Sequence, residues 1–167
     1  MDTAALRTAF TGIVDAAASV TSVVPSPEAP AGEWDADEIL AHVSLVTAAT
    51  IAAASCVAAG VGTTYDNRAA SDLWTIHRLI ARTDGATGLR ERIEAQADAV
   101  CALVWALGEP ELETLIPTLL LSGGAVLVDQ PLPLGAILAG LAEGELPGHR
   151  RQLLALLPSH GQSATGS

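Results

Sequence analysis

The sequence predicts an all-α protein, a four-helix bundle with a long crossover and a small hairpin or extended loop before the last helix. Half of the 167 residues are hydrophobic but only 3% are aromatic, so alanine and leucine supply most of the apolar bulk. That composition favours helices that pack closely through small side chains. Several long stretches also repeat apolar residues at helical spacing, and the length suits one domain with a buried core.

The first two predicted helices lie on either side of a proline-rich connection. Residues 3–23 repeat apolar positions at helical spacing, and VPSPEAPAGEW then favours a surface connection because prolines and glycine interrupt helices. The second helix begins in WDADEILAHVSLV, with Asp35 as N-cap and Glu38 at N3 of a capping box. It is expected to run to about residue 59, where the glycines of GVG end it.

The segment GTTYDNRAASDLWTIHRLIARTDG is the predicted crossover. A helix could begin there at Asp66 or Asn67 and end near Arg82, before a turn at DG. Residues 87–107 then repeat leucine, isoleucine and valine on one side, which predicts the third long helix. The polar cluster YDNR at the start of the crossover helix is read as a helix cap with an ion pair.

The C-terminal part of the chain changes character before it returns to helix. Two short apolar runs flank SGG, a pattern that predicts a β-hairpin or an extended loop. Residues 134–157 resume helical spacing, although Pro147 is expected to kink that helix or start a new segment. We therefore predict one helical domain over residues 1–157 and a disordered tail over residues 158–167.

Charge and hydropathy exclude several classes of partner. The net charge is −11, from 19 acidic and 8 basic residues, and every basic residue is arginine. An acidic surface repels phosphate, so neither nucleic acid nor an acidic membrane is expected as a partner. MDTAALRTAF lacks a basic leader with a long apolar core, and residues 43–61 are too rich in alanine for a favoured membrane span. We expect a cytoplasmic protein.

The two cysteines, Cys56 and Cys101, each lie within an apolar helical pattern. They lack the spacing of a redox or zinc motif, so buried reduced thiols are the preferred interpretation. A disulfide that links two helices is the alternative.

One constellation could carry chemistry. In GELPGHRRQLLALL, Glu145 and His149 stand four residues apart, so on a helix they share one face. A carboxylate and an imidazole so placed can both bind a divalent metal, and His42 of the second helix could be a third ligand. The alternative is a surface pair together with an ordinary core histidine. His77 has no partner at metal spacing, and His160 falls in the tail.

The order W-x-A-x-E-I-L-A-H, YDNRAASD, LVDQPLPL and LAEGELPGHRRQLLAL resembles the DinB-like superfamily, which includes mycothiol-dependent maleylpyruvate isomerases and related thiol S-transferases. The resemblance covers about residues 5–157. It implies a helical bundle that binds one divalent metal through His42, Glu145 and His149. Zinc is the first expectation for that metal, with nickel, manganese or iron as alternatives.

The resemblance also implies a reaction. A low-molecular-weight thiol such as mycothiol would bind the metal as a thiolate and attack a small electrophile. Arg150 or Arg151 could hold a carboxylate of the thiol or of the substrate, or both could be solvated charges at a helix end. The chain is shorter than a maleylpyruvate isomerase and is expected to lack its additional C-terminal domain. No residue set for recognising maleylpyruvate can be identified, so that substrate is not assigned. A non-catalytic, dimeric binding or stress-related protein with a vestigial site is the alternative, and a homodimer is possible in either case.

Overall fold

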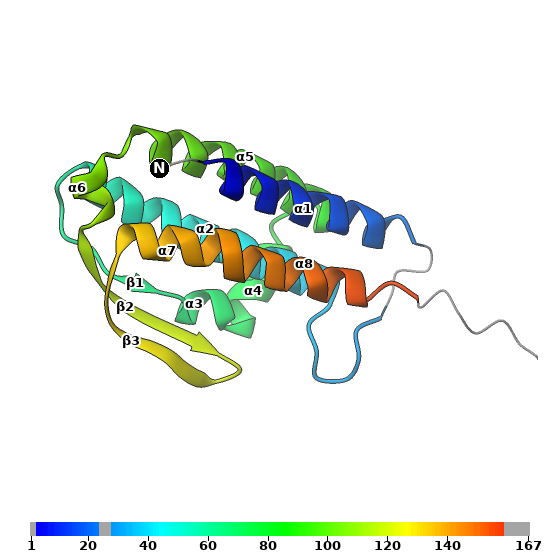
Figure 1. The fold of residues 1–167 in the computed structure, drawn as a ribbon. Coiled ribbons are helices and arrows are strands. Elements are labelled where there is room, and N and C mark those ends of the chain that lie inside the picture. Colours follow the sequence, from blue (N-terminus) through cyan, green and yellow to red (C-terminus); the bar gives the residue numbers. More distant parts are fainter. Residues whose placement is uncertain (1–2, 24–27, 159–167) are drawn as a thin grey trace, which may run out of the picture.

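The computed structural model describes residues 3–23 and 28–158. Long helical stretches pack side by side and form most of the molecule (Figure 1). They are α1 (Ala4–Thr21), α2 (Ala36–Ala58), α5 (Gly85–Ala106) and a last run composed of α7 (Leu134–Gly140), a π-helical turn η1 (Leu141–Glu145) and α8 (Leu146–Ala155). All but residue 158 of the predicted C-terminal tail, His160 included, lies outside the described residues.

The prediction of an all-α four-helix bundle is wrong, because a mixed three-stranded sheet lies against one side of the helices (Figure 1). The strands are β1 (Tyr65–Asp66), β2 (Leu115–Ser122) and β3 (Ala125–Pro133), in the order β1-β2-β3. Strands β2 and β3 are the antiparallel hairpin expected around SGG, but β1 adds to β2 in parallel, with Tyr65 opposite Thr118. A strand of two residues shows no alternation of apolar and polar positions, so its sequence carries no strand signal.

Short helices complete the connections between the long ones. They are α3 (Arg68–Ser71), α4 (Leu73–Ile80) and α6 (Glu109–Leu112). The single crossover helix expected to end near Arg82 is thus two helices, because Asp72 adopts an extended conformation and caps α4 by accepting the backbone N–H of Thr75 at 2.9 Å. The ion pair expected in YDNR is present between Asp66 and Arg68.

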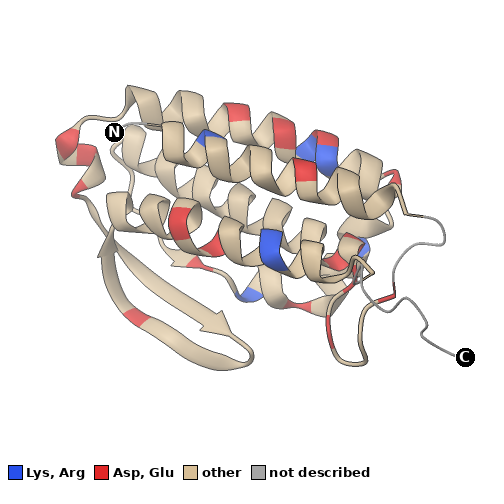
Figure 2. Cartoon of the chain, turned by 45° about the vertical axis from the view of Figure 1, so that its right-hand side comes forward, with Lys and Arg blue, Asp and Glu red and all other residues tan. Residues whose placement is uncertain are grey.

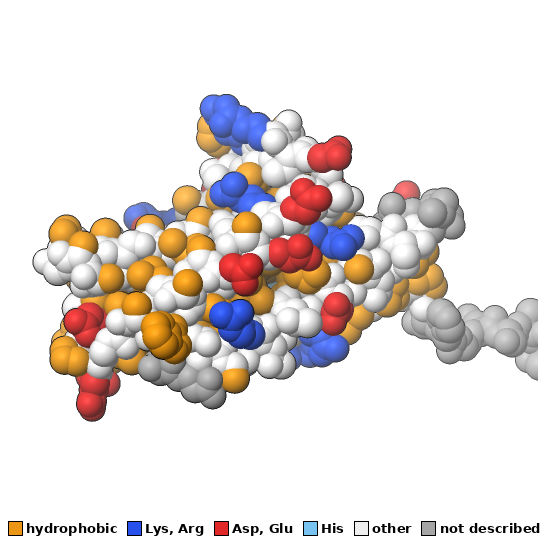
Figure 3. Space-filling model, turned by 90° about the horizontal axis from the view of Figure 1, so that it is seen from above, with side chains coloured by type: hydrophobic (Ala, Val, Ile, Leu, Met, Phe, Trp, Pro, Cys, Tyr) orange, Lys and Arg blue, Asp and Glu red, His pale blue; other side chains and the backbone are white. Residues whose placement is uncertain are grey.

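The core lies between the long helices. Leu6, Phe10, Leu40, Ile93 and Leu138 are among the fully buried side chains that fill it. The predicted capping box that starts α2 is confirmed, since the Asp35 side chain accepts the Glu38 N–H and the Glu38 side chain accepts the Asp35 N–H. On the side of α1 and α5, charged side chains of both signs are scattered among apolar ones (Figure 3).

Pro147 is accommodated by the π-helical turn that precedes it. The Leu146 N–H donates to the Leu141 carbonyl, five residues back instead of four. A proline in the interior of an α-helix would lack a donor and clash with the carbonyl four residues earlier. Here the proline falls in the first turn of α8, where a missing N–H costs little, and the π turn carries Glu145 at its end.

Both cysteines are free; Cys101 is buried and Cys56 is half-buried. Helix α2 is long and apolar enough to cross a membrane by length and composition alone. In the most apolar stretch of that helix, 61% of the residues are buried inside the protein. The core helix of a globular domain has the same property.

Candidate metal centre

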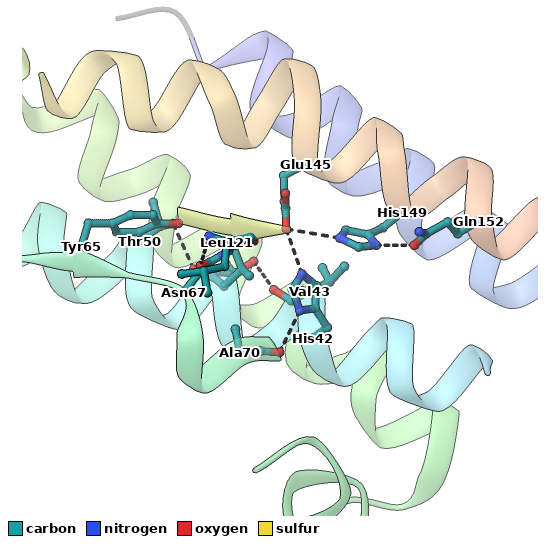
Figure 4. Close-up of polar contacts among 12 residues, drawn as sticks. His42, Val43, Thr50, Tyr65, Asn67, Ala70, Leu121, Glu145, His149 and Gln152 are labelled. Atoms are coloured by element: carbon teal, nitrogen blue, oxygen red, sulfur yellow. Dashed lines mark hydrogen bonds and ion pairs between the residues drawn. The ribbon is translucent and has the colours of Figure 1, made fainter. Parts of the chain in front are cut away.

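His42, Glu145 and His149 converge although more than 100 residues separate the first from the other two (Figure 4). His42 comes from α2, Glu145 from the π turn and His149 from the first turns of α8. The Glu145 Oε1 atom lies 2.8 Å from His42 Nε2 and 3.2 Å from His149 Nε2. The His42 side chain is 5% exposed, that of His149 is 13% exposed and that of Glu145 is 34% exposed. The group therefore lies at the edge of the buried interior, with Glu145 as its most exposed member.

The outer nitrogen of each imidazole is held by a hydrogen-bond acceptor. His42 Nδ1 lies 2.8 Å from the Ala70 carbonyl oxygen, and His149 Nδ1 lies 2.6 Å from Gln152 Oε1. A carbonyl oxygen can only accept, so both Nδ1 atoms carry a proton and donate it. In a neutral ring, each Nε2 lone pair is then directed at the same carboxylate oxygen. Only a further proton or a cation at that point relieves the repulsion among three acceptors.

This arrangement has the features of a metal site. Histidines that bind a metal commonly donate the other ring N–H to a carbonyl or carboxylate, which fixes the ring orientation. Ligand atoms around an ion with bonds of 2.0–2.2 Å lie between about 2.8 Å and about 3.6 Å apart for coordination angles of 90° to 109°. The two distances to Glu145 Oε1 fall close to that range, and all three ligand atoms lie within 4.8 Å of one another. These three side chains could hold a metal ion.

The electrostatics of the group favour a charged carboxylate. Hydrogen bonds from His149 and then from His42 hold the pKa of the Glu145 carboxyl well below its usual range, against the opposing effect of burial. A carboxylate that stays ionised near neutral pH is available as an anionic metal ligand. Three protein ligands leave at least one position open on a four-coordinate ion, as a catalytic site requires.

Trp34 covers one side of the two imidazoles. Its ring centroid lies 4.8 Å from that of His42 and 6.3 Å from that of His149, and the Trp34 and His149 rings are within 19° of parallel. The indole is half-buried and packs against the core. It restricts the approach of water to the group from that side.

A cavity of about 880 Å³ opens beside the three side chains. One wall is helical, with Ile39 and Val46 of α2 and Ile137 and Leu141 of the last helical run. The opposite wall is the hairpin, which contributes apolar residues of β2 and β3 and its glycine turn. The hairpin carries a single charged residue, Asp129, whereas charges are frequent on the helices and their connections (Figure 2).

Tyr65 and Asn67 also line the cavity, but their polar atoms are occupied. The Tyr65 hydroxyl lies 3.1 Å from Thr50 Oγ1, and burial raises the pKa of this phenol. The Asn67 side chain donates to the Leu121 carbonyl at 2.9 Å and accepts the Leu121 N–H at 2.8 Å, which ties the crossover to the hairpin (Figure 4). Two of the four residues of YDNR therefore line the cavity.

The two arginines proposed for substrate binding lie outside the cavity. Arg151 borders a shallow hollow on the outer side of Glu145 and His149, next to Gly144 and Gly148. Arg150 is exposed and extends along α1, where its Cδ would lie 3.0 Å from a Cβ at Gly12. Neither arginine lines the cavity among the described residues, and a role in substrate binding stays a prediction.

The remaining histidine of the described chain is separate from the group. The His77 side chain is 59% exposed and bonds Glu38 Oε1 at 2.8 Å, as expected for a histidine on a helix surface. Two partners of the site were not singled out from the sequence. Gln152 could have been found, because it stands three residues after His149 on a helix. The Ala70 carbonyl could not, since a backbone acceptor leaves no mark in the sequence.

No protein-family model, no curated protein and no solved structure matches this chain.

Proposed function

We propose that the protein binds one divalent metal ion through His42, Glu145 and His149 and uses it to activate a small thiol for transfer to an electrophile. The observation that carries this proposal is the convergence of three ligand atoms within 4.8 Å at the wall of a cavity of about 880 Å³. A site with two histidines and one glutamate is a donor set typical of catalytic zinc. Zinc is therefore the first candidate, and nickel, manganese or iron could use the same imidazoles.

The chain's own residues would orient the metal ligands and limit the access of water to them. Ala70 and Gln152 fix the two imidazoles, and Trp34 shields one side of the group. A bound divalent ion lowers the pKa of a thiol that it coordinates. With such an ion bound, the thiol would lose its proton to solvent, its sulfur would form a bond to an electrophilic carbon, and the bond from that carbon to the leaving group would break with the electron pair departing on the leaving group. The resemblance to DinB-like thiol transferases supports this choice among the reactions open to such a site.

The first experiment measures metal binding. Protein treated with chelator and then titrated with zinc should bind one ion per chain by calorimetry, with a rise in melting temperature. His42→Ala should weaken zinc binding at least about a hundredfold, since it removes a ligand and not only its orienting partner. His77→Ala is the matched control, because it also removes a helix histidine paired with a glutamate. Wild-type protein that binds neither zinc nor nickel would rule the proposal out.

The second experiment tests the reaction. Zinc-loaded protein mixed with mycothiol and chlorodinitrobenzene should release chloride and form the thioether, detected by absorbance and mass spectrometry. The rate should fall to background in His42→Ala and persist in His77→Ala.

A second function is favoured by a different feature of the same group. When the imidazoles carry the further proton on Nε2, they donate to Glu145 Oε1, so the three side chains can also form a polar cluster without a metal ion. A non-catalytic binding protein would keep this cluster as structure. Zinc binding with no turnover of several thiols and electrophiles would favour that function over the transferase.

A further inference from the structure

We infer that the cavity takes the uncharged, apolar body of a small molecule, whose one polar atom reaches the His42–Glu145–His149 group. Under the proposed function this ligand is the electrophile and not the thiol, because the hydroxyl and amide groups of a thiol such as mycothiol would have to stay outside the cavity. The assignment rests on the proposed function only where it makes the ligand a substrate. A volume of about 880 Å³ falls within the range of about 300–1,000 Å³ that is usual for small-molecule sites.

The charges around the cavity exclude an anionic ligand body. All eight basic residues of the chain are arginines in its described part, and none of them lines the cavity. The charged residues that do line it are Glu33 near the opening and Glu145 at the metal group. A carboxylate or phosphate held against the apolar walls would lose its hydration and gain no counter-charge.

The buried polar side chains of the wall offer few free hydrogen bonds, and the two serines that also line the cavity, Ser71 and Ser122, are exposed. Asn67 uses both ends of its amide on the backbone of Leu121. The Tyr65 hydroxyl is engaged with Thr50, and Gln152 Oε1 accepts from His149. A ligand with several hydroxyl or amide groups would leave most of them unpaired, which costs binding free energy. The ligand that fits is an apolar molecule with one polar head directed at the histidines.

The test uses two dyes that differ by one charge, on metal-free protein. N-phenylnaphthylamine is neutral, and anilinonaphthalene sulfonate is the same skeleton with an anionic group. The neutral dye should bind one molecule per chain with increased fluorescence, and at least about tenfold more tightly than the sulfonate. Equal or tighter binding of the sulfonate would overturn the inference. Because no metal is present, the result is independent of whether the proposed metal site functions.

Two glycines of the last helical run provide a matched pair of variants. A Cβ at Gly140 or at Gly144 meets no described heavy atom within 4 Å, so both positions admit a side chain. Gly140 lines the cavity, whereas Gly144 borders only the outer hollow. Gly140→Phe should weaken binding of the neutral dye at least about tenfold by filling the cavity, and Gly144→Phe should leave it unchanged. Unchanged binding in Gly140→Phe, with a melting temperature like that of wild type, would place the dye elsewhere and refute the inference.

A third variant reverses the selectivity. Leu127 of the hairpin lines the cavity and is 66% exposed, so an arginine there can be accommodated. Leu127→Arg should tighten binding of the sulfonate several-fold and narrow the difference between the dyes. If the preference for the neutral dye persists unchanged, charge does not determine which ligand the cavity accepts.

Discussion

The two walls of the cavity differ in how firmly they are built. On the helical side, Leu40 and Leu138 have no exposed surface, and the candidate metal ligands His42 and His149 are held by hydrogen bonds to a carbonyl and an amide. On the hairpin side, β2 buries Ile116 and pairs with β1, but Val126 and Leu127 of β3 are 59% and 66% exposed. The Asn67 side chain adds two hydrogen bonds between the crossover and the hairpin. The candidate metal ligands therefore lie on the well-packed helical wall. We expect the exposed hairpin wall to determine which molecules fit the cavity.

Truncation of one leucine on each wall should give the largest difference. Leu40→Ala leaves a hole in a packed core and should lower the free energy of unfolding by about 2–5 kcal/mol. Leu127→Ala removes exposed surface and should change it by no more than about 0.5 kcal/mol. Urea denaturation measures both. Similar losses in the two variants would mean that the hairpin contributes to the core as much as α2 does.

The link between the walls is the next test. Asn67→Ala removes two hydrogen bonds to Leu121, and leaving these backbone groups unpaired should cost about 1–2 kcal/mol. Hydrogen exchange at the Leu121 amide should accelerate more than exchange in α2. Ser122→Ala, at an exposed position next to it, should alter neither quantity. Acceleration spread evenly over the chain would contradict a local role for Asn67.

On the helical wall, Gln152 holds the outer nitrogen of His149, so we expect it to affect metal affinity. Gln152→Ala frees the His149 ring and should weaken zinc binding about tenfold. Gln130→Ala, on the exposed face of the hairpin, is its control and should bind zinc like wild type. Calorimetric titration gives both values. Wild-type affinity in Gln152→Ala would show that packing alone orients His149.

The smallest expected effect is a pH dependence of stability in metal-free protein. The histidine hydrogen bonds hold the pKa of the Glu145 carboxyl below its ordinary value, so folding favours the charged form. The resulting stabilisation is fully present above about pH 4.3 and is lost as the pH falls toward the lower folded-state value. Wild type should therefore exceed Glu145→Gln in unfolding free energy at pH 6, with a smaller difference at pH 3. Glu143→Gln, at an exposed neighbouring position, should show no such trend.

The long helices were predictable because each carries a strong local signal. The capping box of Asp35 and Glu38 and the apolar repeats of α1, α2 and α5 depend on residues within a few turns of one another. Glycines 123 and 124 of the hairpin turn have positive φ angles, and the SGG pattern predicted that turn. The break at Asp72 was missed, because an aspartate within an apolar repeat can be either a solvated helix residue or a cap.

By itself, the sequence determined the helical periods, the turn glycines, the absence of lysine and the spacing of Glu145 and His149 on one helix face. Only the tertiary structure decided that His42 meets this pair, that β1 joins the hairpin and that no arginine lines the cavity. The physical reason is the distance along the chain over which each interaction acts. Helix and turn signals arise from neighbours in the chain, whereas a ligand group or a parallel strand pair depends on how distant segments pack, and no local pattern encodes that packing.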